Sequence, residues 1–528
     1  MDWTQPYASR RAPVRARNVI ATSQPLAAQA GLAMLHGGGN AIDAAVAAAI
    51  TLTVVEPIMN GIGGDLYAMV WDGQRLHGLD ATGAAPEAWS PERFAGRSEM
   101  PRTGWDSVTV PGQVAGWKAL SERFGALPFA RLFDPAIRYA SDGFPVSPVI
   151  ASVWPQLAAL VADVPGFVDA FLPGGCAPLA GELWRFPDQA ATLAEIAATD
   201  GESFYRGRLA QSIADCAHAQ GGAMTADDLA RHEARWVEPL AQRYRCVTLH
   251  EIPPNGQGVA AQMALGMLAH FDLRGSGVDS AETLHLQIEA MKLAFADLHA
   301  HVGDPRSMRT SAAELLHPDY LAARARLIDP QRAQAQRAGA PRQGGTVYLA
   351  AADAAGRMVS LIQSNYYAFG SGVVVPGTGI ALHNRGWNFS LEAGHPNLVG
   401  PRKKPLHTII PGFVTDAEQR PLMAFGVMGG FMQAQGHVQM LCRLADFEQN
   451  PQAMIDAPRF MVSPRDGIVR VEAHMPRHTT EGLRARGHVI EVLPTGHLDF
   501  GAAQIVLSTG NHHAGASDGR RDGQAIGF

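Results

Sequence analysis

Cysteine is scarce in this sequence, since only four occur among 528 residues, widely separated and without a Cys-x-x-Cys pair. This spacing fits neither a disulfide framework nor a zinc site. The longest apolar run, between Asp43 and Glu56, is shorter than the roughly 20 residues of a membrane-spanning helix. The N-terminal arginines are not followed by an apolar segment, so no secretory signal is visible and a cytoplasmic location is expected.

A strong charge of one sign is also lacking. The chain carries 43 basic and 49 acidic residues, a formal net charge of −6, and 47% of its residues are apolar. A mildly acidic total gives no electrostatic reason to expect nucleic acid or an anionic membrane as a partner. The composition is typical of a globular protein that buries a large core, and it excludes disorder and collagen-like repeats.

Several cofactor and metal motifs are missing. No GxxxxGK segment occurs, residues 61–66 have leucine where GxGxxG needs its last glycine, and the 20 histidines form no HExxH. Residues 515–519 match GxSxG, but no histidine follows Ser517, as hydrolases with that motif require. We therefore expect no cofactor and no metal.

The texture of the sequence changes at about two-thirds of its length. Residues 26–50 predict two alanine-rich helices, the second capped by Asn40, and residues 280–300 predict a long amphipathic helix. Residues 330–345 are polar, rich in alanine and glycine and free of aromatics, which predicts a linker. The segments that follow are β-branched and alternate in polarity, as in strands joined by short turns.

A threonine stands at the junction of linker and strand, in Gly344-Gly345-Thr346. Such a residue is ordinarily only a β-former. The alternative is autocatalytic cleavage, in which the Thr346 hydroxyl attacks the Gly345 carbonyl and water then releases a new N-terminal threonine. Glycine before the cut removes side-chain hindrance. The freed α-amine, with a pKa of about 7.7–8.0, would serve as general base near neutral pH.

Sequence blocks along nearly the whole chain support the second interpretation. In order they are GGNAIDAAVAAAITLTVVEP, NGIGGD, VPGQVAGW, PPNGQG, IEAMKLAFADLHAHVGDP and the run from TVYLAAAD to SNYYAFGSGV. Together they resemble the γ-glutamyltransferase (glutathione hydrolase) family of N-terminal-nucleophile hydrolases. The resemblance implies an α/β fold, the four-layer αββα sandwich of Ntn hydrolases. It also implies Thr346 as nucleophile and cleavage after Gly345, with segments 1–345 and 346–528 forming one interleaved domain.

The resemblance implies further catalytic residues, Asn365, Gly429 and Gly430, and places Gln363 among the substrate-binding residues. Asn365 stands where the family has an asparagine that helps to hold the nucleophile and its amine, and Gln363 where it has a threonine that touches the nucleophile. Gly429 and Gly430 match the glycine pair of the oxyanion hole. Two consecutive N–H groups without Cβ crowding suit that role, and each such donor contributes about 10²–10³ in rate.

The substrate-binding positions depart from the family pattern. His407 and Thr408 replace a serine pair. Arg385 and Asn388 lie where transpeptidases hold the glutamyl α-amino group with acidic residues. Arginine repels an ammonium and instead binds a carboxylate through two parallel hydrogen bonds. A solvated surface arginine is an equally good interpretation from sequence alone. The segment between Phe389 and Lys403 is short, so we expect no lid loop and free access of water.

These features predict a self-processing threonine amidohydrolase that cleaves γ-glutamyl amides such as glutathione through an acyl-Thr346 ester, with hydrolysis favoured over transpeptidation. The alternative is an amidohydrolase or acylase acting on a monoamide of a small dicarboxylic acid, glutaryl- or oxamate-like, which Arg385 and Asn388 favour. A second alternative is an unprocessed, non-catalytic binding paralogue. The expected partners are a carboxylate-bearing amide and the two segments of one precursor. Association of two such heterodimers stays open.

Overall fold

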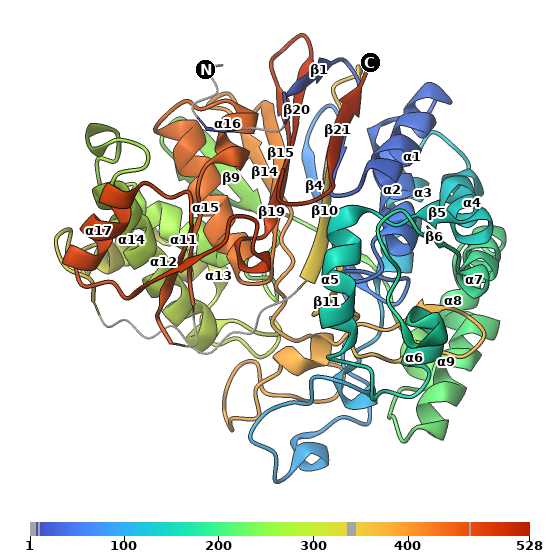
Figure 1. Ribbon diagram of the computed structural model, residues 1–528. Coiled ribbons are helices and arrows are strands. Elements are labelled where there is room, and N and C mark those ends of the chain that lie inside the picture. Colours follow the sequence, from blue (N-terminus) through green and yellow to red (C-terminus); the bar gives the residue numbers. More distant parts are fainter. Residues whose placement is uncertain (1–6, 9–10, 335–344, 464–465) are drawn as a thin grey trace.

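Two seven-stranded sheets packed face to face form the centre of the molecule (Figure 1). The computed structural model describes residues 7–8, 11–334, 345–463 and 466–528. The first sheet has the order β21 (Gln524–Gly527), β2 (Val19–Thr22), β10 (Gly345–Ala352), β11 (Met358–Tyr366), β3 (Asp65–Trp71), β4 (Leu76–Ala81), β7 (Arg235–Val237). The second has the order β1 (Val14–Ala16), β20 (His513–Ser517), β19 (Ala502–Ser508), β15 (Pro421–Met428), β14 (Gly412–Thr415), β9 (Val247–Glu251), β8 (Leu240–Tyr244). Every strand pairing in both sheets is antiparallel.

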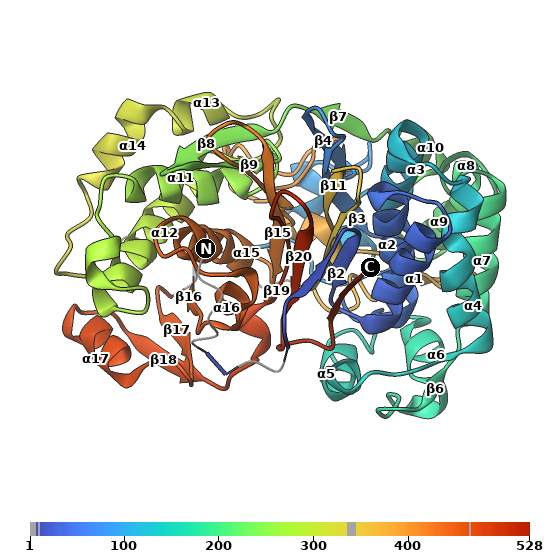
Figure 2. The same cartoon turned by 90° about the horizontal axis from the view of Figure 1, so that it is seen from above.

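Helices cover the outer face of each sheet, as the view from above shows (Figure 2). The first sheet is covered by α1 (Pro25–His36), α2 (Ala41–Val55) and α3 (Gln113–Phe124), with α4 (Asp134–Asp142) packed outside α2 and α7 (Pro187–Ala198) beside α4. The second is covered by α11 (Gly258–Leu268) and α15 (Met432–Ala445), with α12 (Ala281–His301) and α14 (Pro318–Ala325) packed against α11. This helix–sheet–sheet–helix order confirms the predicted four-layer sandwich. No helix of the described residues is long and apolar enough to cross a bilayer.

Shorter elements complete the chain. The helices are α5 (Pro148–Ala158), α6 (Phe167–Phe171), α8 (Glu202–Arg206), α9 (Arg208–Ala219), α10 (Ala226–Ala230), α13 (Ala312–Leu315), α16 (Pro451–Asp456) and α17 (Arg477–Ala485). The remaining strands are β5 (Phe144–Pro145), β6 (Leu183–Trp184), β12 (Val374–Val375), β13 (Ile380–Ala381), β16 (Phe460–Val462), β17 (Val469–Glu472) and β18 (Ile490–Leu493).

Local sequence explains the central helix α2. Asn40 caps it as predicted, because its side chain accepts hydrogen bonds from the backbone of Ile42 and Asp43. The Asp43 carboxylate returns a bond to the Asn40 backbone, completing a capping box. All fifteen residues of α2 are buried, which its unbroken apolar composition allows.

Strand β10 lies at the heart of the sandwich. Its side chains alternate, so that Val347 and Leu349 pack in the core shared with α2 while Tyr348 and Ala350 pack in the core between the sheets. Its neighbours are β2 from the first third of the chain and β11 from the second segment. Segments on both sides of the predicted cleavage point therefore contribute strands to the same sheets, and Thr346 lies at the start of β10, next to the middle strand β11.

Candidate active site

Thr346 follows the first residue of β10 and is 1% exposed. The register against β11 shifts at this point, with Gly345 opposite Tyr366 and Val347 opposite Gln363, as in a β-bulge. Tyr366 has a φ of +77°, a conformation that a bulky residue rarely adopts. Bulges reorient a side chain next to a functional site, and here the irregularity sets the direction of the threonine hydroxyl.

The hydroxyl of Thr346 lies within a small polar network. The Ser364 hydroxyl donates to the Gly345 carbonyl oxygen at 2.5 Å and lies 3.5 Å from Thr346 Oγ1. It also accepts a bond from the Tyr366 backbone at 2.6 Å. From the second sheet's side, Gln433 Nε2 of α15 donates to Thr346 Oγ1 at 3.1 Å. The nucleophile candidate, the carbonyl before it and a donor for that carbonyl are thus adjacent.

The predicted oxyanion pair lies where β15 ends and α15 begins. Gly429 and Gly430 have φ values of +124° and +63°, which favour glycine. Neither N–H donates to a backbone oxygen of the described residues. Gln257 Nε2 fixes the Gly430 carbonyl at 2.9 Å. Gly429 lines a cavity together with Thr346, so its backbone faces the same space as the nucleophile.

That cavity has a volume of about 320 Å³. Its walls are mainly apolar, formed by Met59, Leu157, Leu160, Tyr367, Ala368, Met428, Met461 and Leu498. Its polar lining comes from Gln156, His497, Asp499 and Arg521, in addition to Gly345, Thr346 and Gly429. A cavity of this volume is of the size that holds a small organic molecule, and Thr346 and Gly429 both face it.

Gln363 and Asn365 lie on either side of Ser364 but make no described contact with Thr346. Gln363 bonds to Asn60, to the Ala49 carbonyl and to the Trp117 indole, on the α2 side of the sheet. Sequence reasoning missed Ser364. No sequence signal could have found it, because the bulge at Gly345 sets which face of β11 meets Thr346.

Asn365 is wholly buried, and both of its amide atoms are without a partner among the described residues. It packs against two glycines of the NGIGGD block. A Cβ at Gly61 would lie 2.9 Å from Asn365 Nδ2, and one at Gly64 would lie 3.1 Å from Asn365 Oδ1. The glycines of this block are therefore needed so that Asn365 fits beside them.

Arg385 is wholly buried in a short turn, so the alternative of a solvated surface arginine is wrong. Its Nη1 donates to Thr408 Oγ1 at 2.8 Å, and its guanidinium carbon lies 4.4 Å from the centre of the Tyr366 ring. Burial lowers the pKa of Arg385 to about 10, with Asp65 as the main opposing influence. Asn388 accepts a bond from the Tyr366 hydroxyl at 2.5 Å.

Asp65 anchors the other side of this group. It accepts bonds from the backbone of Gly83 and Gly112, and its Oδ2 lies 3.1 Å from His407 Nε2. Burial raises the pKa of Asp65 to about 7, an effect that Arg385 opposes, and burial lowers the pKa of His407 well below its usual range. The structure thus places Arg385 and Asn388 against Tyr366, Thr408 against Arg385, and His407 beside Asp65 and Tyr67, and none of these four predicted residues lines the 320 Å³ cavity.

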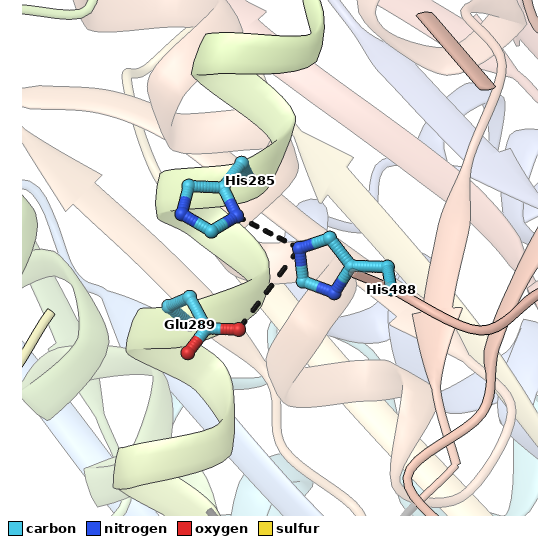
Figure 3. A group of neighbouring side chains, drawn as sticks. All are labelled: His285, Glu289 and His488. Atoms are coloured by element: carbon cyan, nitrogen blue, oxygen red, sulfur yellow. Dashed lines mark hydrogen bonds and ion pairs between the residues drawn. The ribbon is translucent and has the colours of Figure 1, made fainter. Parts of the chain in front are cut away.

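One group among the described residues has metal-ligand side chains within reach of one another (Figure 3). His285 and Glu289 lie one turn apart on α12, and His285 Nδ1 is 2.8 Å from His488 Nε2. The Lys292 ammonium, however, lies 2.6 Å from Glu289 Oε1. A fixed cation already neutralises the carboxylate that a metal would need, so the group is better described as a hydrogen-bond junction.

This junction holds the chain ahead of the predicted linker. Glu289 accepts a bond from the Gln334 backbone, and Lys292 donates to the Gln334 carbonyl at 3.2 Å. His285 Nε2 bonds the Asp329 carbonyl at 2.7 Å. Residues 330–334 are therefore anchored on α12, while most of the predicted linker, residues 335–344, lies outside the described residues.

Comparison with known proteins agrees with this geometry. A family model described as gamma-glutamyltranspeptidase matches residues 27–528. The glutathione hydrolase-like YwrD proenzyme of Bacillus subtilis is 34% identical over 520 residues, covering 97% of this chain and 98% of its own. The oxamate amidohydrolase proenzyme of Klebsiella pneumoniae subsp. pneumoniae is 36% identical over 518 residues, covering 95% and 97%.

Among solved structures, a cephalosporin acylase from Bacillus halodurans superposes with a TM-score of 0.94 at 46% sequence identity, covering 99% of this chain and 98% of its own. The relatives share the fold and the amide chemistry that their names describe. Those names differ in the substrate.

Proposed function

We propose, from the premise that the chain belongs to the gamma-glutamyltranspeptidase family, that it is a self-processing threonine amidohydrolase with Thr346 as nucleophile. The enzyme is a hydrolase or acyltransferase acting on amide bonds. The observation that carries the proposal is the contact of Ser364 with both the Gly345 carbonyl and the Thr346 hydroxyl, beside a cavity that Gly429 also lines.

Processing begins with attack of Thr346 Oγ on the Gly345 carbonyl carbon. The Ser364 hydroxyl, which already donates to that carbonyl oxygen, stabilises the negative charge that develops there. The C–N bond then breaks, and the proton of the Thr346 hydroxyl ends on the Thr346 nitrogen. Water hydrolyses the resulting ester and leaves a Gly345 carboxylate and a free α-amine on Thr346. The products would be segments 1–345 and 346–528.

Turnover uses the same oxygen with its own amine as base. The α-amine removes the hydroxyl proton, and Gln433 Nε2 orients Oγ1 for attack on the substrate carbonyl. The backbone N–H groups of Gly429 and Gly430 stabilise the tetrahedral oxyanion. The amine half leaves with the proton, and water then cleaves the acyl-Thr346 ester. Hydrolysis exceeds transpeptidation, because the short segment 389–403 leaves the ester open to water.

The acyl donor is a γ-glutamyl amide such as glutathione, or the monoamide of a small dicarboxylic acid. Arg385 favours the second, since its buried cation beside neutral Asn388 would repel a glutamyl α-ammonium and attract a carboxylate. The relatives named oxamate amidohydrolase and cephalosporin acylase support that direction.

The test combines mass spectrometry with a matched substrate pair. Purified wild-type protein is expected as two fragments that divide between Gly345 and Thr346, whereas Thr346→Ala stays whole and inactive. Glutaryl 4-nitroanilide is expected to react faster than γ-glutamyl 4-nitroanilide, and the reverse order would assign the enzyme to γ-glutamyl amides. An intact, inactive wild-type chain would instead support the non-catalytic binding paralogue.

A further inference from the structure

Arg521 is a buried cation that faces the same cavity as Thr346. Its side chain is 5% exposed and lines the 320 Å³ space with Thr346 and Gly429. Its guanidinium donates one hydrogen bond within the described part of the chain, from Nη1 to the Arg520 carbonyl at 2.7 Å. Its Nε is buried without an acceptor among the same residues. Most of its donors therefore remain available.

The neighbouring Arg520 is also buried, but its guanidinium forms ion pairs within the protein. Arg520 is similarly buried, and its guanidinium pairs with the carboxylates of Glu472 and Asp518. Asp518 also binds Arg459 at 2.6 Å. Arg521 has no carboxylate within ion-pair distance among the described residues, although it follows directly in the sequence. The two adjacent arginines thus differ in having, or lacking, an internal counter-charge.

The carboxyls whose charges act on Arg521 are Glu56, Asp518 and Asp522; each has a partner elsewhere, although Oε1 of Glu56 is buried without one among the described residues. Glu56 accepts a bond from the Ser23 hydroxyl at 2.5 Å, and Asp522 accepts bonds from the backbone of Val149 and Ile150. A buried charge without a paired group is costly. A guanidinium kept in that state at the wall of a cavity is suited to bind an anion from outside the chain.

The other residues that line the cavity limit the kind of molecule that can carry the anion. Apart from Arg521 the cavity wall is mainly apolar, with Leu157, Leu160 and Met461 among its members. The carboxylate among its lining residues, Asp499, lies 3.8 Å from Arg470 Nη1. The space therefore suits a molecule with an apolar or aromatic body and one acid group.

We propose that Arg521 binds a carboxylate of the amide substrate in the Thr346 cavity and thereby selects amides that combine an apolar body with an acid group. This inference rests on the proposed amidohydrolase function. It assigns a second cationic position, in addition to Arg385, to substrate selection.

Four anilides test it: pentanoyl or glutaryl acyl groups, each joined to 4-nitroaniline or to 3-carboxy-4-nitroaniline. Each matched pair differs by one carboxylate, on the acyl half or on the amine half. Arg521→Gln is expected to reduce the preference for the carboxylated member by about 10–100-fold in kcat/KM for the half that reaches Arg521, the loss of a charge-assisted hydrogen bond. Pentanoyl 4-nitroanilide has no carboxylate for Arg521 to bind, so its rate is the reference against which the preference of each variant is measured.

Arg521→Lys keeps the positive charge but cannot form two parallel hydrogen bonds to a carboxylate, so it is expected to lose part of the preference for the carboxylated anilide. The exposed Arg138→Gln is the matched control, and mass spectrometry of each variant reports its processing. Equal losses on all four anilides, or unchanged preferences in both Arg521 variants, would overturn the proposal. Turnover of pentanoyl 4-nitroanilide by wild type tests the amidohydrolase function itself. If the wild-type enzyme hydrolyses none of the four anilides, both the amidohydrolase function and this inference are rejected.

Discussion

Arg385 and Arg521 are both buried close to Thr346, yet their surroundings differ. Each has a buried carboxyl nearby, Asp65 for Arg385 and Glu56 for Arg521, and burial raises the pKa of each carboxyl to about 7. Arg385 is enclosed by the Thr408 hydroxyl and the Tyr366 ring. Arg521 borders an open cavity instead. Burial alone therefore does not decide which arginine meets the substrate.

The difference is linked to the bond that processing breaks. Gly345 is paired with Tyr366, the residue whose ring covers Arg385. Cleavage after Gly345 releases that pairing, so we expect the Arg385 side to open only in the mature enzyme. The Arg521 side is already a cavity in the uncut chain. Arg521 would then reach a substrate without rearrangement, whereas Arg385 would reach one only after the chain has been cleaved.

The largest difference is expected in stability. Arg385→Leu removes the hydrogen bond to Thr408 and a buried cation that lowers the pKa of Asp65, which should lower the free energy of unfolding by about 1.5–3 kcal/mol. Arg521→Leu removes one hydrogen bond to a backbone carbonyl but also removes a buried cation without a paired carboxylate, and because these effects have opposite signs the change should stay below about 1 kcal/mol. Urea unfolding in a Thr346→Ala background, which keeps the chain whole, measures both. Equal losses would show that the two arginines are equally part of the scaffold.

The next largest effect concerns Ser364, which bonds both Gly345 and Tyr366. Ser364 donates to the Gly345 carbonyl and accepts from the Tyr366 backbone, so Ser364→Ala removes the donor for the charge formed during self-cleavage. We expect processing to slow about 10²-fold. Conversion of the chain of 528 residues to fragments, followed on a denaturing gel, gives the rate. Ser364→Thr, which keeps a hydroxyl, should restore most of it; no slowing in the alanine variant would assign the donor elsewhere.

A smaller effect should appear in pH dependence. Burial raises the pKa of Glu56 from 4.5 to about 7. Between these values the unfolded chain has lost this proton while the folded chain keeps it, so the contribution of Glu56 to stability falls as pH rises and levels off above about pH 7.

Glu56→Gln removes this dependence. Relative to wild type, the variant should therefore gain on the order of 2 kcal/mol between pH 5 and pH 8, measured by urea unfolding in the Thr346→Ala background. Buried histidines with lowered pKa values act in the opposite direction but cancel in this difference. A difference that does not change with pH would mean that Glu56 is ionised throughout, as a direct partner of Arg521 would make it.

Much of the fold could be predicted from the sequence. Three local patterns predicted it: the apolar run of α2 with its Asn40 cap, the alternating strands after residue 345, and the order of the sequence blocks. Each depends on neighbouring residues whose local structure is kept in the tertiary fold. Thr346 could be singled out because its role needs only its own hydroxyl, its future amine and a glycine before it. These properties are encoded within three consecutive residues.

The surroundings of Thr346 could not be read in the same way. The bulge at Gly345 changes which face of β11 meets the threonine, so Ser364 takes the contact for which Gln363 and Asn365 were the candidates. Whether an arginine has a partner depends on residues distant in sequence. Arg520 finds Glu472 across 48 positions, while adjacent Arg521 finds no carboxylate among the described residues. No local pattern distinguishes the two.

Lys292, a third buried cation, provides the baseline for this comparison and the smallest expected effect. It is paired with Glu289 at 2.6 Å and also reaches the Gln334 carbonyl, so it has neither an open cavity nor a missing counter-charge. Because this pairing occupies the carboxylate beside His285 and His488, EDTA should leave the melting temperature and the anilide turnover unchanged, and added Zn²⁺ should not raise the melting temperature. A zinc-dependent rise in wild type that His488→Ala removes would show that the junction releases Lys292 to a metal. Lys292 could then no longer serve as the example of a paired buried cation with which Arg521 is compared.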